Sequence, residues 1–150
     1  MPQSLAKNYV HIIFSTKYRQ PFIKDDVEDA LFAYLGAMCK DMDCQPIKIG
    51  GYRDHVHILC LLSRKVAMMD LLEEIKAHSS KWMKTQGHAF KNFYWQDGYA
   101  AFSVSPTSVD RVIRYIENQK KHHQEIKFQD EMRQLFKKNK IDYNETYVWD

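Results

Sequence analysis

The chain has 150 residues, of which 45% are hydrophobic and 27% charged, with a formal net charge of +3 at pH 7. This length suits one domain, residues 1–150, whose core can fold without disulfides. No long apolar run is present, so the sequence predicts neither a signal peptide nor a membrane span.

The three cysteines, Cys39, Cys44 and Cys60, are odd in number and lack a paired metal spacing. They indicate reduced, mostly buried thiols in a cytoplasmic protein.

Positive charge is concentrated near the C-terminus. Residues 111–140 hold nine Lys or Arg against four Asp or Glu. Such a basic segment fits a phosphate-rich partner. The alternative is an ordinary solvated helical face, and charge alone favours that alternative.

The first half of the chain alternates strands and helices. Residues 8–16 are rich in β-branched and aromatic side chains and predict a strand. Residues 24–43 repeat apolar side chains at helical spacing, and Asp25 with Glu28 has the spacing of a capping box. Two short strands, 47–51 and 55–62, are so close in sequence that they predict an antiparallel hairpin.

The second half repeats this order. A helix is predicted over 68–84, and residues 92–104 predict a short strand, a turn at Gly98 and a strand from residue 99 to 104. A long helix then opens near Pro106, with Ser105 or Thr107 as its cap, and runs to about residue 124. The side of the 68–84 helix that we expect to be apolar carries Leu71, Leu72, Ile75, His78 and Trp82.

A further polar helix over about 125–138 and an aromatic tail close the chain. The order strand, helix, strand, strand, helix, strand, strand, helix predicts an α+β fold, a ferredoxin-like sandwich in which helices pack on an antiparallel sheet.

Two histidines stand at the head of an apolar strand, in the segment "YRDHVHILCLL". Residues two apart in a strand share a face, so His55 and His57 lie about 6.7 Å apart at the backbone and can bind one metal ion. The intervening Val56 belongs to the opposite face and to the main core. We expect the polar end of the histidine face to border a cleft. The alternative is a pair of histidines on a half-exposed strand, and a third ligand is needed to decide.

Tyr115 lies on the long helix but outside its apolar stripe, by roughly 110°. Gln119 is about 40° from Tyr115, so the phenol and the carboxamide share one flank. His122 falls on the same flank one turn later. The alternative is an exposed tyrosine that stacks on a neighbour.

These segments together resemble a known family. "DHVHIL" resembles the metal motif of the HUH endonucleases, and "YIENQ" resembles the tyrosine motif of their single-tyrosine transposases, called TnpA. "STKYRQP" and "WQDGYAAFSVS" are also similar to sequences of that family, so the likeness extends from about residue 9 to residue 123. The REP-associated tyrosine transposases share these motifs.

The resemblance implies a DNA transposase that cleaves and rejoins single-stranded DNA at insertion-sequence ends. Tyr115 would attack the scissile phosphate and form a 5′-phosphotyrosine. His55, His57 and Gln119 would bind one divalent metal, magnesium or manganese. Nitrogen ligands favour manganese for affinity, and cellular abundance favours magnesium.

The implied substrate is single-stranded DNA with subterminal hairpins, bound by a homodimer whose subunits share their active sites. Tyr18 and Tyr52 are candidates for stacking on unpaired bases. The candidate phosphate contacts are Lys17, Arg19, Arg53, Arg114, Lys120 and Lys121.

Three other functions stay open at this point. A zinc hydrolase can use His-x-His, but it usually supplies further ligands close by, and this segment has none. A ferredoxin-like module can bind nucleic acid without catalysis, in which case Tyr115 is dispensable. A REP-associated nuclease domesticated by its host would keep the same chemistry.

Overall fold

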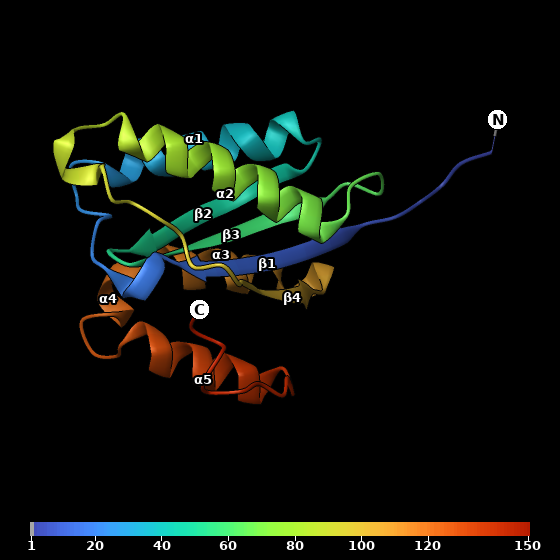
Figure 1. The fold of residues 1–150 in the computed structure, drawn as a ribbon. Helices are drawn as coiled ribbons and strands as arrows, with labels where there is room; N and C mark the ends of the chain where they lie inside the picture. The colour runs from blue at the N-terminus through green and yellow to red at the C-terminus, as the bar shows by residue number, and fades with distance from the viewer. Residues whose placement is uncertain (1) are drawn as a thin grey trace.

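A four-stranded antiparallel sheet forms the centre of the computed structural model, which describes residues 2–150 (Figure 1). The strand order is β2-β3-β1-β4, so β1 and β3 are the central strands. Every neighbouring pair is antiparallel. The strands are β1 (Asn8–Ser15), β2 (Gln45–Tyr52), β3 (His55–Leu62) and β4 (Ala100–Val104).

Helices α1 (Glu28–Asp41) and α2 (Met68–Lys84) cover one face of the sheet (Figure 1). Between them and the sheet lies the main hydrophobic core, to which β3 contributes Val56, Ile58 and Cys60. The predicted core face of β3 is therefore confirmed. All three cysteines are buried as free thiols, as predicted.

The other face is covered by α3 (Val109–Glu117), α4 (Gln119–His122) and α5 (Phe128–Lys138) (Figure 1). A second, smaller core lies between α5 and the sheet, and it contains Ile13, Phe102, Phe128, Met132 and Phe136. Short 3-10 helices are η1 (Lys17–Arg19), η2 (His88–Phe90) and η3 (Pro106–Ser108).

The C-terminus folds back between α5 and the end of β1. The backbone carbonyl of Asp150 accepts the amide N–H of Gly98 at 2.9 Å, and the carbonyl of Trp149 accepts from the guanidinium of Arg19 at 2.8 Å. The side-chain amide of Gln96 also donates to the Asp150 carbonyl, at 3.3 Å. The last residues thus hold the segment that precedes β4.

The element order confirms the α+β, ferredoxin-like prediction, but the short strand predicted before Gly98 is absent from the described residues. Only a single bridge, from Thr16 to Trp95, forms there. The carbonyls of residues 96–98 instead accept hydrogen bonds from the ammonium group of Lys76 on α2. These carbonyls have a charged donor, so they do not need a neighbouring strand.

The long helix predicted over 105–124 is interrupted. After the η3 turn, α3 ends at Glu117, and Asn118 stands between α3 and α4 with φ −91° and ψ 11°. The capping prediction is also wrong, because Val27 is the N-cap of α1 and no side chain caps that end. Glu28 instead forms an ion pair with Lys120 of α4.

On α2, His78 was placed on the apolar side, but it is exposed, and Ser79 and Met83 are buried. The Ser79 hydroxyl accepts the indole N–H of Trp95 at 2.8 Å, which explains why a polar side chain is tolerated there. No helix of residues 2–150 combines the length and the apolar character needed to cross a membrane.

Gly50 allows α3 to pack closely against β2. A Cβ at this position would lie 2.8 Å from Cγ2 and 3.1 Å from the backbone oxygen of Ile116. Because the oxygen belongs to the helix backbone, Gly50→Ala must push α3 away. We expect a loss of about 1–3 kcal/mol in the free energy of unfolding, measured by urea denaturation.

The matched control is Gly36→Ala on α1, where the new Cβ would meet Ile49 at an ordinary 3.5 Å. Alanine is favoured over glycine inside a helix by about 1 kcal/mol, so this variant should be at least as stable as the parent. Equal stability of the two variants would contradict the close approach at Gly50.

Candidate active site

His55 and His57 begin β3 on the face that α3, α4 and α5 cover. Both side chains are fully buried, with ring centroids 5.1 Å apart. The predicted cleft therefore does not reach the two imidazoles themselves. The physical reason is that α4 and α5 close over this end of the sheet and bring further polar side chains onto the pair.

The outer nitrogens of the two rings have partners that set their orientation. Nδ1 of His55 lies 2.8 Å from Oδ1 of Asp54, and Nδ1 of His57 lies 2.8 Å from Nε2 of His11. If Nδ1 of each ring carries the proton, Nε2 of His55 and Nε2 of His57 each have a free lone pair, and both atoms face Glu131 of α5. Carboxylate or ring partners of this kind orient histidine ligands in metal sites.

Gln119 opens α4 and reaches His55 directly. Its Oε1 lies 2.8 Å from Nε2 of His55, and its amide nitrogen donates to Oε2 of Glu131 at 2.9 Å. The side chain is buried. After the break at Asn118, α4 thus begins at Gln119, the residue to which the family resemblance assigns the role of third ligand.

Tyr115 lies on α3, one turn before Gln119. Its ring centroid is 5.7 Å from that of His57 and 6.0 Å from that of His11. Its hydroxyl donates a hydrogen bond to Oε2 of Glu131. A single chain therefore brings Tyr115, His55, His57 and Gln119 into one cluster.

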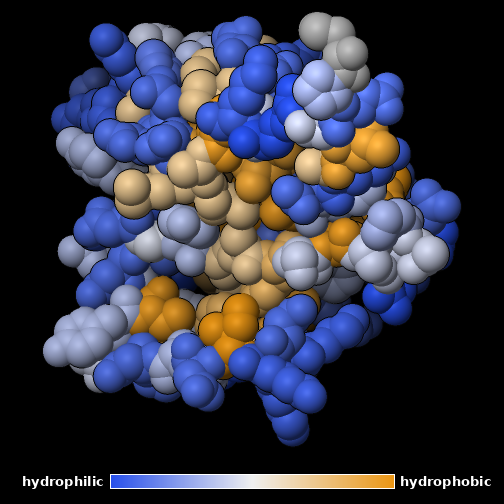
Figure 2. All heavy atoms as spheres, turned by 90° about the vertical axis from the view of Figure 1, so that its right-hand side faces the viewer, coloured by the Kyte–Doolittle hydropathy of each residue, from blue (hydrophilic) through white to orange (hydrophobic). Residues whose placement is uncertain are grey.

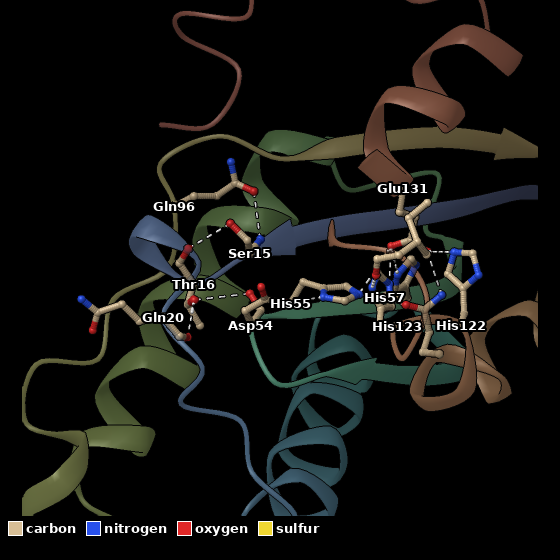
Figure 3. A network of polar contacts seen from close by, with 12 residues as sticks. Ser15, Thr16, Gln20, Asp54, His55, His57, Gln96, His122, His123 and Glu131 are labelled. Atoms are coloured by element: carbon tan, nitrogen blue, oxygen red, sulfur yellow. Dashed lines mark hydrogen bonds and ion pairs between the residues drawn. The ribbon is translucent and has the colours of Figure 1, made fainter. Parts of the chain in front are cut away.

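Glu131 descends from α5 into the middle of this cluster (Figure 3). Only 1% of the residue is exposed. Its Oε1 lies 3.5 Å from Nε2 of His55, 3.4 Å from Nε2 of His57 and 2.9 Å from Nε2 of His123. Burial alone would raise the pKa of Glu131, but the surrounding histidines hold it well below its ordinary value.

His123 balances the charge of Glu131. Its Nδ1 lies 2.7 Å from the carbonyl oxygen of Ile126 and its Nε2 faces the Glu131 carboxylate, so both ring nitrogens meet acceptors. Burial lowers the pKa of His123, but its hydrogen bond to Glu131 and the carboxylate charge outweigh that effect and raise it. This contact offsets part of the cost of burying the carboxylate.

The two rings deeper in the site are neutral. Burial, with a smaller contribution from His57, lowers the pKa of His11 to about 3. Burial also lowers the pKa of His57. Tyr115 shifts the other way, because burial and the nearby Glu131 charge raise the pKa of its phenol. The hydroxyl stays protonated at neutral pH unless a cation or a base helps it to ionise.

The donor set fits a divalent metal. The ligand atoms of His55, His57 and Glu131 all lie within 4.8 Å of one another. Nε2 of His57 is buried and makes no hydrogen bond. At His55, a lone pair on Nε2 would face the lone pairs of Gln119 Oε1, so this contact needs either a proton or a cation between the two atoms.

Cavities flank the cluster on two sides. One of about 430 Å³ borders Tyr115 and has both apolar and basic walls, including Phe102, Arg111 and Lys138. Another, of about 450 Å³, is bordered by Tyr52, Arg53 and His123.

On the side of the molecule where β1 begins, hydrophobic side chains reach the surface between hydrophilic ones (Figure 2).

The basic residues predicted to bind DNA fall into two groups. Three have partners within the chain: Lys17 pairs with Asp97 at 3.3 Å, Arg19 donates to Trp149, and Lys120 pairs with Glu28. The other three make no ion pair among residues 2–150; they are Arg53, Arg114 and Lys121. The latter group is the better placed to bind a phosphate.

Glu131 and His11 are among the residues of the cluster that the sequence analysis did not predict. Glu131 lies within the apolar stripe of α5, beside Phe128 and Met132. A charged residue in such a stripe is unusual, so the sequence did indicate a residue with a special role there. His11 shares a face with Ile13 on β1, but only the pairing of β1 with β3 places it beside His57.

Comparison with known proteins identifies the family of the chain. The family model for IS200-like transposases matches residues 4–119. The ISDra2 transposase TnpA from Deinococcus radiodurans is 25% identical over 114 residues, which cover 73% of this chain and 81% of the relative.

Solved structures share the fold. The crystal structure of a protein from Deinococcus radiodurans R1, assigned as a transposase, superposes with a TM-score of 0.62 at 24% identity, covering 79% of this chain and 98% of the other. A REP-associated tyrosine transposase bound to a REP hairpin superposes with a TM-score of 0.60 at 13% identity, covering 82% and 73%. Since the family model spans well over half of the sequence, this chain belongs to the IS200-like transposase family.

Proposed function

We propose that this transposase is metal-dependent and cleaves and rejoins single-stranded DNA at insertion-sequence ends through a 5′-phosphotyrosine intermediate. The observation that carries the proposal is the position of the Tyr115 hydroxyl. It lies in the same cluster as the two histidines and Gln119, joined to them through Glu131. A nucleophile beside a candidate metal site is the arrangement that phosphoryl transfer to a side chain requires.

A divalent ion held by His55, His57 and Gln119 would polarise the scissile phosphate and offset the charge that builds on it. Tyr115 Oη forms the new bond to phosphorus while the bond from phosphorus to the 3′ oxygen breaks. The 3′ oxygen leaves with that electron pair and takes a proton from water. Glu131 accepts the hydrogen bond of the phenol and orients it, and the phenol proton replaces in the solvent the proton that the 3′ oxygen takes.

The covalent product explains how the strand is rejoined. The tyrosine ester keeps the energy of the broken phosphodiester, so the 3′ hydroxyl of a second DNA end can attack it and release Tyr115. Strand transfer then needs no nucleotide hydrolysis, which agrees with the absence of a glycine-rich phosphate-binding loop from the sequence.

Hairpin DNA is the proposed substrate, since the REP-associated neighbour was solved with a REP hairpin. Arg53 is a candidate contact for the backbone, and Tyr52 beside it is half-buried at the edge of the 450 Å³ cavity. The Arg53 guanidinium lies over the Tyr52 ring, 5.3 Å from its centroid, and such a pair suits an unpaired nucleotide.

A homodimer with shared active sites remains a prediction, measurable by light scattering on the purified chain. Leu59, which follows the histidines on the same face of β3, is fully buried within the single chain and so offers no surface to a partner. The described chain also brings its own tyrosine to its own histidines. A cis site is therefore available without a second subunit.

The test is incubation of the full chain with labelled single-stranded hairpin DNA and Mn²⁺. We expect a protein–DNA adduct that survives denaturant and that mass spectrometry maps to Tyr115. An insertion-sequence end and a repetitive palindrome serve as two substrate arms, because the two branches of the family would differ in which one they cleave. Absence of an adduct with both, or an adduct on another residue, would refute the proposal.

A further inference from the structure

Glu131 is the residue of the cluster that the recognised motifs do not include. It lies on α5, beyond residue 119, where the match to the family model ends. Its carboxylate is buried and is surrounded by nitrogen and oxygen atoms of the candidate metal site, on which its side chain points down from α5 (Figure 3). A buried carboxylate in such a place needs a reason, because burying it is costly.

We infer that Glu131 is a fourth protein ligand of the divalent ion, through Oε1, and that α5 is therefore part of the catalytic centre. The inference rests on the proposed function in one respect, namely that His55, His57 and Gln119 hold such an ion.

The separations between donor atoms support this assignment. In an octahedral site with ligands about 2.1 Å from the ion, neighbouring ligand atoms are about 3 Å apart. Glu131 Oε1 is 3.5 Å from Nε2 of His55 and 3.4 Å from Nε2 of His57. Gln119 Oε1 is 2.8 Å from Nε2 of His55. These three separations are close to those between neighbouring ligand atoms in a coordination shell.

The chemistry of the donors points the same way. Two imidazoles and a carboxamide are neutral, so they leave both charges of the ion uncompensated in a buried site. A carboxylate contributes a negative charge and a hard oxygen, which Mg²⁺ and Mn²⁺ prefer. His123 donates to the same Oε1 and holds it in place, as outer partners of metal ligands commonly do.

The other oxygen of Glu131 contacts the nucleophile. Oε2 accepts hydrogen bonds from the Tyr115 hydroxyl and from the Gln119 amide. One carboxylate thus connects the ion to the attacking oxygen and sets the distance between them. A different arrangement, in which Glu131 occupies the place of the ion, makes the opposite prediction, since removal of its charge would then improve metal binding.

The experiment is calorimetric titration of the full chain with Mn²⁺. Glu131→Gln removes the charge and keeps the shape, and we expect it to weaken Mn²⁺ binding by about tenfold to a hundredfold. The matched control is Glu125→Gln, which removes the same charge from an exposed residue before α5 and should leave affinity within about twofold. His57→Ala serves as the reference for loss of the site.

Three outcomes separate the inference from the proposed function. Weakened binding in Glu131→Gln, with Glu125→Gln unchanged, supports the inference. Unchanged or tighter binding in Glu131→Gln, while His57→Ala loses it, overturns the inference and leaves the proposed function standing. Wild-type protein that binds no Mn²⁺, or His57→Ala that binds as wild type does, overturns both.

A second measurement covers a variant that fails to fold, which circular dichroism would reveal. It uses wild-type crystals soaked in Mn²⁺. A distance of about 2.2 Å between the ion and Oε1 of Glu131 supports the inference. An ion bound to the two histidines but more than about 3.5 Å from both Glu131 oxygens overturns it.

Discussion

Tyr115→Phe is expected to abolish the covalent DNA adduct and to reduce cleavage of single-stranded DNA by about 10⁴-fold or more, as loss of a nucleophile does in other enzymes. The variant lacks the oxygen that would attack phosphorus but keeps the ring, whose edges pack against His11 and His57. Hairpin binding, measured by gel shift, should therefore change little.

The matched control for this prediction is Tyr147→Phe, which removes the same atom from a tyrosine that is 69% exposed near the C-terminus. It should cleave as wild type does. A denaturant-stable adduct formed by Tyr115→Phe would mean that another residue is the nucleophile. Normal cleavage by that variant without an adduct would instead favour a hydrolytic enzyme in which water attacks the phosphate.

The second large effect is expected at His57. His57→Ala removes a candidate metal ligand, and we expect cleavage to fall by about 10²–10³-fold, the usual effect of deleting one electrostatic contact to the reacting group. It also removes the hydrogen-bond partner of His11 in a fully buried site, at a cost of about 1–3 kcal/mol in stability.

Thermal unfolding separates these two effects. A ligand that binds only the folded chain raises its melting temperature, so Mn²⁺ should stabilise the wild type and leave His57→Ala unchanged. The control is His78→Ala, since His78 is exposed on α2 and pairs only with Glu74. If Mn²⁺ raised the melting temperature of His57→Ala as much as that of the wild type, the ion would be bound elsewhere.

The alternation of β3 and the flank of α3 were predictable because they are local patterns. Period two places His55 and His57 on one face, and period 3.6 places Tyr115 and Gln119 on one flank. Both predictions agree with the structure, where these four side chains meet. Each of these two predictions follows from the spacing of two residues within one element and needs no knowledge of how the elements pack.

Glu131 could not be assigned from the sequence because its role depends on how α5 docks. A turn at residues 123–127 connects α4 to α5, and it places α5 over the two histidines. The direction of that turn is fixed by contacts such as His123 to Ile126, which no periodicity reveals. The apolar stripe of α5 marks Glu131 as an unusual charged residue, but it does not show what the carboxylate contacts.

Errors in the fold have similar causes. Residues 92–97 have strand-forming side chains, but the ammonium group of Lys76 donates hydrogen bonds to the carbonyls of residues 96–98. The helix that contains Tyr115 breaks at Asn118, where the sequence has no glycine or proline. This break was therefore not visible in the sequence. In both places a tertiary contact overrides a local preference.

The docking of the last residues against the segment before β4 has a practical consequence for anyone who produces this protein. An affinity tag fused after Asp150 would begin at a carbonyl that already accepts hydrogen bonds from Gly98 and Gln96, and it would crowd the contacts that hold the segment before β4. Residues 2–7 are exposed and form no regular structure, so a purification handle belongs at that end.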